Sequence, residues 1–302
     1  MCSRRAGASW TYVVSGKEWA LTSLFTIPEV ADFYEQKTRA VMRRFGPGPR
    51  VHYRTGFVDG PVTATTSEEL RKVLVAAQER VLYDAGEFWR LARVPFRDVL
   101  DAGCGLGGGA IFWAQEFGAR VTAATITRSH VELVAKFAAQ AGVAALVRPI
   151  LCDALTVPGE SCFDAALALD SSDTFPRAPW FRRLARLLRR HAHVFIYDCF
   201  LENPEYAGPI NRHWCAQIGT FNEYVGAARD VGFRLELFED VSHRTRDFWT
   251  LTIALYEAEK REGVLSPWDR ARFQEALEVH ALMRQGLYDG GLRYALVSFV
   301  RD

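Results

Sequence analysis

Apolar residues near the start of the chain recur at helical spacing. In residues 30–45, Val30, Phe33 and Val41 fall on one side of a helix. Residues 46–50, GPGPR, combine prolines and glycines, which end a helix. The pattern therefore predicts a helix that stops before residue 46, and residues 51–61 read as an irregular or extended segment.

A second helical run covers residues 70–92. Thr66 precedes it, and Glu69 follows Thr66 by three residues. This is the spacing of a capping box, in which the two side chains bond to each other's backbone N–H groups at the start of a helix. We therefore expect the second helix to begin immediately after Thr66.

From residue 94 onward, short apolar runs alternate with amphipathic segments. The runs that predict strands are 94–103, 119–126, 147–153, 163–170 and 191–200. The segments between them that predict helices are 107–118, 128–142 and 179–190. Strand–helix alternation with short links is typical of a parallel sheet covered on both faces. The middle of the chain is therefore predicted to form a doubly wound α/β sheet.

The pattern changes after residue 220. A helix is expected over 221–233, followed by strands at 234–242 and 249–256 and a helical insert at about 263–286. The final segment, 292–302, is expected to close the sheet as an edge strand. These elements predict an antiparallel C-terminal hairpin on the parallel sheet. We divide the chain into an N-terminal helical arm and cap, residues 1–75, and a main domain, residues 76–302.

Composition excludes several classes of protein. The 302 residues are 49% apolar and 24% charged, which rules out disordered and fibrous chains. A net charge of +1 gives no electrostatic basis for binding nucleic acid or an anionic membrane. The six cysteines include no C-x-x-C pair, and no apolar stretch predicts a signal peptide or a transmembrane helix. We therefore expect a reduced, cytoplasmic protein.

The most informative segment is VLDAGCGLGGGA, residues 99–110. Glycines after a strand let the backbone approach a ligand closely. Gly103, Gly105 and Gly108 also form a G-x-G-x-x-G frame, so a dinucleotide site is an alternative. Asp101 upstream favours another interpretation, because D-x-G-x-G-x-G-G after apolar residues resembles motif I of class I S-adenosylmethionine-dependent methyltransferases.

This resemblance implies a fold and a cofactor site. The fold is a doubly wound, mostly parallel seven-stranded Rossmann-like sheet with an antiparallel C-terminal hairpin and an N-terminal helical cap. The cofactor is S-adenosyl-L-methionine. The residues implied to bind it are Asp101, Gly103, Gly105, Gly107, Thr125, Ile126, His130, Asp153, Ala154 and Leu169. The second strand ends in Thr125-Ile126-Thr127 without an acid, as in a subgroup similar to cyclopropane-fatty-acid synthases.

Three segments resemble the C-terminal half of bacterial geranyl diphosphate C-methyltransferases: 211–214, 240–249 and 286–290. Related enzymes methylate isopentenyl diphosphate, longer prenyl diphosphates or the prenyl tails of indole compounds. The resemblance implies methylation of an alkene carbon of a prenyl-type small molecule. The resulting carbocation would be quenched by deprotonation or by cyclisation. Alternatives are an O- or N-methyltransferase, with Asp170 or His213 as base, and a non-enzymatic cofactor-binding subunit.

A carbocation is stabilised by ring faces, and 13% of this chain is aromatic. We expect catalytic roles for Asp170, Tyr53 and Trp214, with Asp173 as a second candidate carboxylate. The residues expected to line the acceptor pocket are His52, Tyr197, Phe200, Arg212, Phe221, Phe248, Trp249 and Tyr288.

A metal ion is expected only if the acceptor is a diphosphate. Enzymes of the resembled group that use diphosphates have a pair of asparagines that helps to hold Mg²⁺, whereas this chain has residues 33–37, FYEQK. Glu35 is then the one candidate metal ligand in that stretch. We expect a small-molecule acceptor, a homo-oligomer, and an arm over residues 1–28 whose Trp10 and Trp19 help to cover the acceptor pocket.

Overall fold

The computed structural model describes residues 24–302, and the part of the expected arm before residue 24 lies outside the described residues. The strands are β1 Asp98–Ala102, β2 Arg120–Thr125, β3 Val147–Leu151, β4 Phe163–Leu169, β5 Leu188–Leu201, β6 Phe233–Asp240 and β7 Leu292–Arg301. The helices are α1 Ile27–Phe45, α2 Ser67–Phe88, α3 Gly108–Phe117, α4 Arg128–Gln140, α5 Arg177–Leu187, α6 Ala207–Trp214, α7 Phe221–Arg229, α8 Ser242–Arg261, α9 Pro267–Ala271 and α10 Phe273–Asp289.

The strands form one seven-stranded sheet in the order β3-β2-β1-β4-β5-β7-β6. Strands β1 to β5 are parallel, and β7 runs antiparallel to both of its neighbours. Successive strands step outward from β1 on one side and from β4 on the other. In such sheets, ligands bind in the crevice at the carboxyl ends of the strands where the order reverses. The predicted doubly wound sheet is therefore confirmed, and its reversal lies between β1 and β4.

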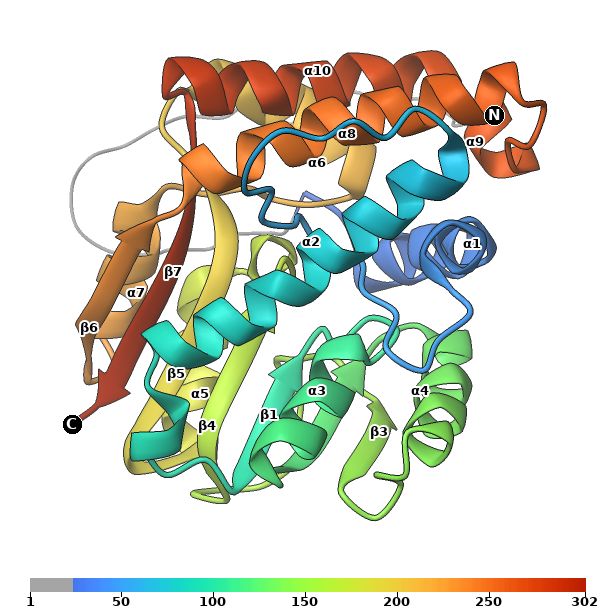
Figure 1. The fold of residues 1–302 in the computed structure, drawn as a ribbon. Coiled ribbons are helices and arrows are strands. Elements are labelled where there is room, and N and C mark those ends of the chain that lie inside the picture. Colours follow the sequence, from blue (N-terminus) through green and yellow to red (C-terminus); the bar gives the residue numbers. More distant parts are fainter. Residues whose placement is uncertain (1–23) are drawn as a thin grey trace.

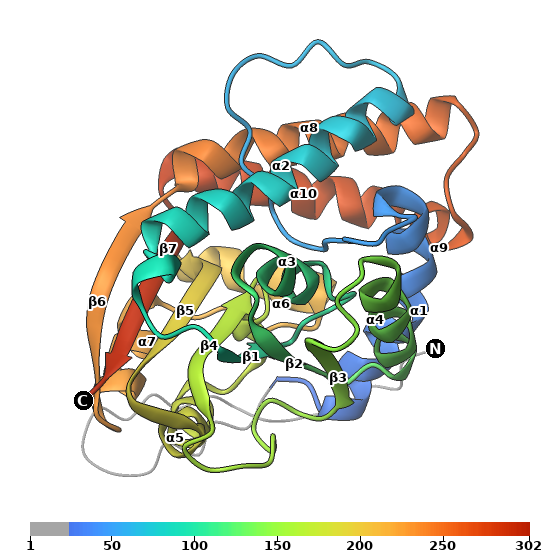
Figure 2. The ribbon, with the colours of Figure 1, turned by 60° about the horizontal axis from the view of Figure 1, so that its bottom comes forward.

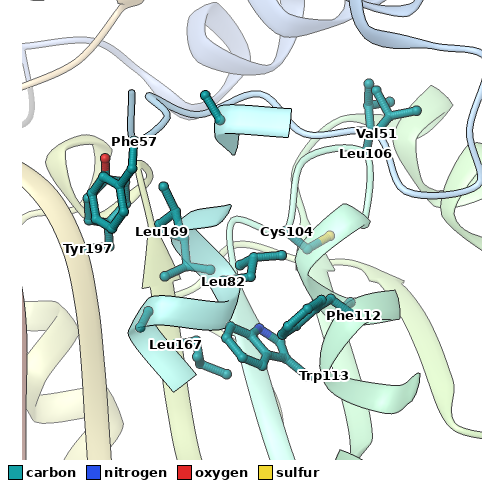
Figure 3. Close-up of a cluster of buried hydrophobic side chains, with 14 of the residues drawn as sticks. Val51, Phe57, Leu82, Cys104, Leu106, Phe112, Trp113, Leu167, Leu169 and Tyr197 are labelled. Atoms are coloured by element: carbon teal, nitrogen blue, oxygen red, sulfur yellow. The ribbon is translucent and has the colours of Figure 1, made fainter. Parts of the chain in front are cut away.

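Helices cover both faces of the sheet. Figure 3 shows part of the larger core, in which Leu82 of α2 lies near Phe112 and Trp113 of α3 and Leu167 of β4. A second core lies on the other face, where Trp180 and other residues of α5 and α7 pack on the sheet. Helices α2, α8 and α10 lie side by side, and α1 lies next to α4 (Figures 1 and 2).

The start of α2 is as the sequence predicts. Thr66 Oγ1 accepts from the Glu69 N–H at 3.3 Å, and the Glu69 carboxylate accepts from the Thr66 N–H at 3.1 Å. The segment between α1 and α2 has no regular secondary structure and crosses the start of α3, where it is buried at Val51 and His52. Residues 46–66 are called the crossing segment below. The domain boundary expected after residue 75 falls inside α2.

The predicted strand at 249–256 is wrong, because these residues belong to α8. The buried positions of this segment include Phe248, Thr252, Leu255 and Glu259, which recur every three or four residues. That spacing is helical. The β-branched threonines and isoleucine suggested a strand, but packing against α2 and α10 determines the structure.

The prediction that the final segment forms an edge strand is also wrong. This segment is β7, which lies between β5 and β6. Its residues are buried almost throughout, whereas β6 is mostly exposed. A strand with neighbours on both sides must present apolar side chains to both covered faces, and LRYALVSFVR does so. The charged strand FRLELFED tolerates the solvent-facing edge.

Across the described residues, no helix is long and apolar enough to cross a membrane.

We predict opposite effects on stability for two glycine substitutions. A Cβ on Gly108 would lie 2.5 Å from Val51 O and closer still to His52 Nδ1, so Gly108→Ala should lower the free energy of unfolding by roughly 1–3 kcal/mol. Gly226 in α7 has no heavy atom within 4 Å of such a Cβ. Gly226→Ala should therefore raise stability by about 0.5–1 kcal/mol. Urea denaturation of both variants measures this, and equal effects would contradict the packing of the crossing segment on α3.

Candidate active site

A cavity of about 450 Å³ lies at the carboxyl ends of the central strands and is bounded by α1. Most residues expected to bind the cofactor line it: Gly103, Gly105, Thr125, Ile126, His130, Asp153, Ala154 and Leu169. Asp101 and Gly107 do not. We call this space the outer cavity.

The glycine turn after β1 forms one wall of the outer cavity. Gly103 has φ +73°, and a Cβ there would lie 2.7 Å from Ser171 Cβ. Gly105 has φ +53°, and a Cβ there would meet nothing within 4 Å. The turn therefore requires glycine for its backbone conformation and leaves open space above Gly105. Gly107, at φ +80°, instead lets α3 pack closely on Val134 of α4.

Asp101 lies behind this turn and is buried. Burial raises the pKa of Asp101 to about 6, and the Arg54 guanidinium and the Ala110 N–H act in the opposite direction. Arg54 comes from the crossing segment and lines the outer cavity. Its Nε and Nη1 are buried and have no hydrogen-bond partner among residues 24–302. A buried guanidinium with free N–H groups is suited to bind a carboxylate or phosphate.

His130, at the start of α4, lines the outer cavity and contacts α1. Its Nε2 lies 2.8 Å from Thr38 Oγ1, and its Nδ1 is buried without a partner in the described part of the chain. Burial lowers the pKa of His130 to about 4, so the ring is neutral at pH 7. Thr38 was not predicted as a site residue, because only the fold brings α1 next to α4.

A second cavity of about 110 Å³ extends toward α6, α8 and α10, and we call it the inner cavity. Its wall includes Trp214, Phe248, Trp249, Tyr256 and His280. Both cavities are lined by Tyr34, Lys37, Val41, Tyr53, Arg54 and Asp170, which we call the junction.

The rings of the inner cavity contact one another. The Trp214 Nε1–H donates to the Tyr53 hydroxyl at 3.2 Å. The Trp214 ring lies 5.6 Å from the Trp249 ring and stacks on His280 at 6.0 Å, measured between ring centroids. The structure therefore brings together Tyr53, Trp214, Phe248 and Trp249, all of which the sequence analysis placed near the acceptor.

Asp170 follows β4 directly and has a left-handed backbone, with φ +51°. One carboxylate oxygen, Oδ2, accepts from the Thr55 N–H at 2.6 Å. The other, Oδ1, is buried and has no hydrogen-bond partner among the described residues. Burial raises the pKa of Asp170, and the neighbouring Asp198 carboxylate raises it further. A carboxylate with a raised pKa and a free oxygen at a cavity wall is suited to accept a proton.

Two further acids lie beside Asp170. Asp198 Oδ2 accepts from the Ser172 hydroxyl at 2.6 Å and from the Ser172 N–H at 2.9 Å. Asp173, the second candidate carboxylate, lines the inner cavity. Asp198 was not predicted, although its position in an apolar strand, HAHVFIYDCF, is a signal that could have been used.

Several expected pocket residues lie elsewhere. His52 is buried below the glycine turn with Nε2 2.5 Å from Glu79 Oε2, and the Tyr197 hydroxyl donates to Thr55 O at 3.1 Å. Phe200 and Phe221 contact each other in the core on the other face of the sheet. Arg212 is exposed, and 54% of Tyr288 is exposed. None of these side chains lines either cavity.

Glu35, the expected metal ligand, lines neither cavity. Glu35 is exposed, and its carboxylate accepts from the Ser129 N–H at 3.2 Å at the start of α4. Within residues 24–302, no group of three or more His, Cys, Asp or Glu side chains is placed to hold a metal. The described residues therefore offer no metal site made of three or more such side chains, whereas Mg²⁺ at a diphosphate is commonly held by one or two carboxylates together with the phosphates.

Comparison with known proteins identifies the class. Residues 99–191 match the family model described as a methyltransferase domain. The chain is 32% identical to 27-O-demethylrifamycin SV methyltransferase of Amycolatopsis mediterranei, over 59% of this chain and 69% of that protein. It is 26% identical to geranyl diphosphate 2-C-methyltransferase of Streptomyces lasalocidi, over 74% of this chain and 79% of that protein.

Solved structures show the same fold. The geranyl diphosphate C-methyltransferase of Streptomyces coelicolor A3(2), in complex with Mg²⁺, geranyl-S-thiolodiphosphate and S-adenosyl-L-homocysteine, has a TM-score of 0.77 at 18% identity, covering 93% of this chain and 100% of that one. The fold and the glycine turn are therefore those of an S-adenosylmethionine-dependent methyltransferase. The chain belongs to the class I family of these enzymes.

We predict that His130 makes stability depend on pH. The unfolded chain protonates this histidine below about pH 6.5, whereas the folded protein resists protonation until about pH 4. The wild-type protein should therefore lose roughly 2 kcal/mol through this group between pH 7.5 and pH 5. His130→Gln removes this titrating group, so the variant should not lose that stability. Its free energy of unfolding relative to wild type should therefore be about 2 kcal/mol higher at pH 5 than at pH 7.5. Urea denaturation at both pH values measures it, and a pH-independent difference would contradict the prediction.

Proposed function

We propose that this methyltransferase transfers a methyl group to an alkene carbon of a prenyl-type small molecule. The observation that carries the proposal is the inner cavity, which is lined both by the rings of Tyr53, Trp214 and Trp249 and by Asp170, whose Oδ1 has no hydrogen-bond partner among the described residues. Aromatic faces stabilise positive charge and exclude water, which a carbocation requires. The resemblance to geranyl diphosphate 2-C-methyltransferase supports the same acceptor class.

We propose that the outer cavity holds the cofactor. The open space above Gly105 admits a ligand against the backbone, and Thr125 and Asp153 line the same wall. The free Nε and Nη1 of Arg54 match the carboxylate at the amino-acid end of S-adenosylmethionine. Asp101, on the far side of the glycine turn, helps to hold the Arg54 guanidinium in place through the attraction between their charges.

When bound, S-adenosylmethionine supplies an electrophilic methyl group on a sulfonium sulfur. The alkene π electrons would form the new C–C bond while the methyl–sulfur bond breaks and its electron pair stays on sulfur, giving neutral S-adenosylhomocysteine. This would leave a tertiary cation on the neighbouring carbon of the acceptor. Each ring face within about 6 Å of such a cation contributes roughly 0.5–2 kcal/mol. Asp170 then takes a proton from the carbon beside the cation, and the electrons of that C–H bond form the new alkene.

O-Methylation is the second candidate, because the 27-O-demethylrifamycin SV methyltransferase is 32% identical over 59% of this chain, against 26% over 74% for the geranyl diphosphate 2-C-methyltransferase. In that reaction Asp170 would take the proton of a hydroxyl group. His213, the other expected base, lines neither cavity, and its Nδ1 lies 3.0 Å from Glu275 Oε1. Asp170 is therefore our proposed base in both reactions.

The sharpest test follows the methyl group itself. The enzyme is incubated with methyl-¹³C-labelled S-adenosylmethionine and with acceptors that carry both an alkene and a hydroxyl group, and the label is located by NMR. We expect the labelled methyl group on a former alkene CH carbon of the prenyl group, which is either sp² again after loss of its proton or a saturated CH centre after cyclisation. A label found on oxygen or nitrogen would overturn C-methylation in favour of the second candidate.

We predict separate effects on turnover and cofactor binding for Asp170→Asn. The amide keeps an oxygen for the Thr55 N–H but cannot accept the proton, so kcat should fall by about 10²- to 10⁴-fold. The Kd for S-adenosylhomocysteine, measured by calorimetry, should change little. Asp247→Asn is the control, because Asp247 bonds to the exposed Tyr288 hydroxyl outside both cavities. Loss of cofactor affinity in Asp170→Asn would contradict the assignment.

A further inference from the structure

Lys37 on α1 is a buried cation at the junction of the two cavities. Its Nζ lies 4.7 Å from the centroid of the Tyr53 ring and 5.0 Å from that of Phe33. These rings favour the charged ammonium but neutralise none of its charge.

No carboxylate oxygen of the described residues lies within 4 Å of Lys37 Nζ, although lysines are rarely buried without a partner. The acid whose charge acts most on it, Asp269, is already engaged. Asp269 forms an ion pair with Arg44 at 3.2 Å and accepts from the Tyr256 hydroxyl at 3.1 Å. Burial lowers the pKa of Lys37 to about 7, and Arg44 adds to that effect. The ammonium therefore lacks a counter-charge, and the free side of its environment is the cavity.

The solved neighbour that contains geranyl-S-thiolodiphosphate also contains Mg²⁺. In the described part of this chain, no three His, Cys, Asp or Glu side chains are grouped to hold a metal, and Glu35 lines neither cavity. A diphosphate bound at the junction needs positive charge beside it, which Lys37 can supply.

We propose that Lys37 binds the anionic end of the acceptor directly, with its ammonium donating to phosphate oxygens of a prenyl diphosphate and no divalent metal in between. This inference rests on the proposed function and specifies the acceptor's charged group. In an allylic diphosphate a single methylene group separates the alkene from the ester oxygen. Lys37 and Asp170 line the same two cavities, so the phosphate and the alkene can occupy neighbouring positions. Arg54 beside Asp170 offsets the negative charge of that carboxylate.

The test compares a charged and a neutral ligand of the same shape. Calorimetry measures binding of geranyl diphosphate and of geraniol to the enzyme saturated with S-adenosylhomocysteine, with either EDTA or Mg²⁺ present. Wild-type enzyme should bind geranyl diphosphate equally well in both conditions. Lys37→Met keeps the length and apolar stem of the side chain, and it should weaken geranyl diphosphate about 10- to 100-fold while changing geraniol less than about twofold. Lys37→Arg should restore most of the lost affinity.

Lys260→Met is the matched control, because Lys260 Nζ also lies over a ring, 4.5 Å from the Phe273 centroid, but lines neither cavity. It should leave both affinities unchanged. A requirement for Mg²⁺ in wild-type binding, unchanged affinity for geranyl diphosphate in Lys37→Met, or an equal loss for geraniol would each overturn the inference.

The outcome is separable from that of the proposed function. If neutral prenyl compounds are methylated on carbon while geranyl diphosphate does not bind, C-methylation stands and the Lys37 inference fails. If the methyl label appears on oxygen, C-methylation fails, and the binding measurements still decide whether Lys37 recognises the anion.

Discussion

The structure of the site depends on keeping buried carboxylates at one edge of the sheet. Parallel pairing brings Asp101 of β1, Asp170 after β4 and Asp198 of β5 to the same edge, since these three strands are neighbours. Burial raises the pKa of each. Such groups are tolerated only when other groups compensate for their desolvation. Arg54 and the Thr55 N–H supply part of that compensation, and both come from the crossing segment, which must therefore lie over the edge.

Local patterns brought together most of the residues that line the outer cavity. The glycine turn and the ends of β2, β3 and β4 are each adjacent in sequence to a strand, so the parallel order alone places Gly103, Thr125 and Asp153 around one crevice. The capping box at Thr66 is local in the same way. By contrast, Lys37 and Thr38 reach the site because α1 packs beside α4, which no short-range pattern encodes.

The aromatic residues show a different limit. Side chains alternate between the two faces along a strand. Tyr197 of β5 points to the face covered by α2 and α3, whereas Phe200 points to the face covered by α5 and α7. This alternation could have excluded Phe200 from the pocket. In segment 249–256 the composition suggested a strand, but the buried positions follow a helical spacing. This helix, α8, places Trp249 in the wall of the inner cavity.

The two cavities are built from different parts of the chain. The outer cavity is formed mainly by turns at the sheet edge, and the inner cavity by side chains of α1, α6, α8 and α10. Substitutions on these helices can reshape the inner cavity while the sheet and its glycine turn stay intact. Under the proposed assignment of the two cavities, evolution can therefore change the acceptor independently of the methyl donor. This division of the two cavities between different elements is consistent with the comparisons. The chain is similar both to a relative named for C-methylation and to one named for O-methylation.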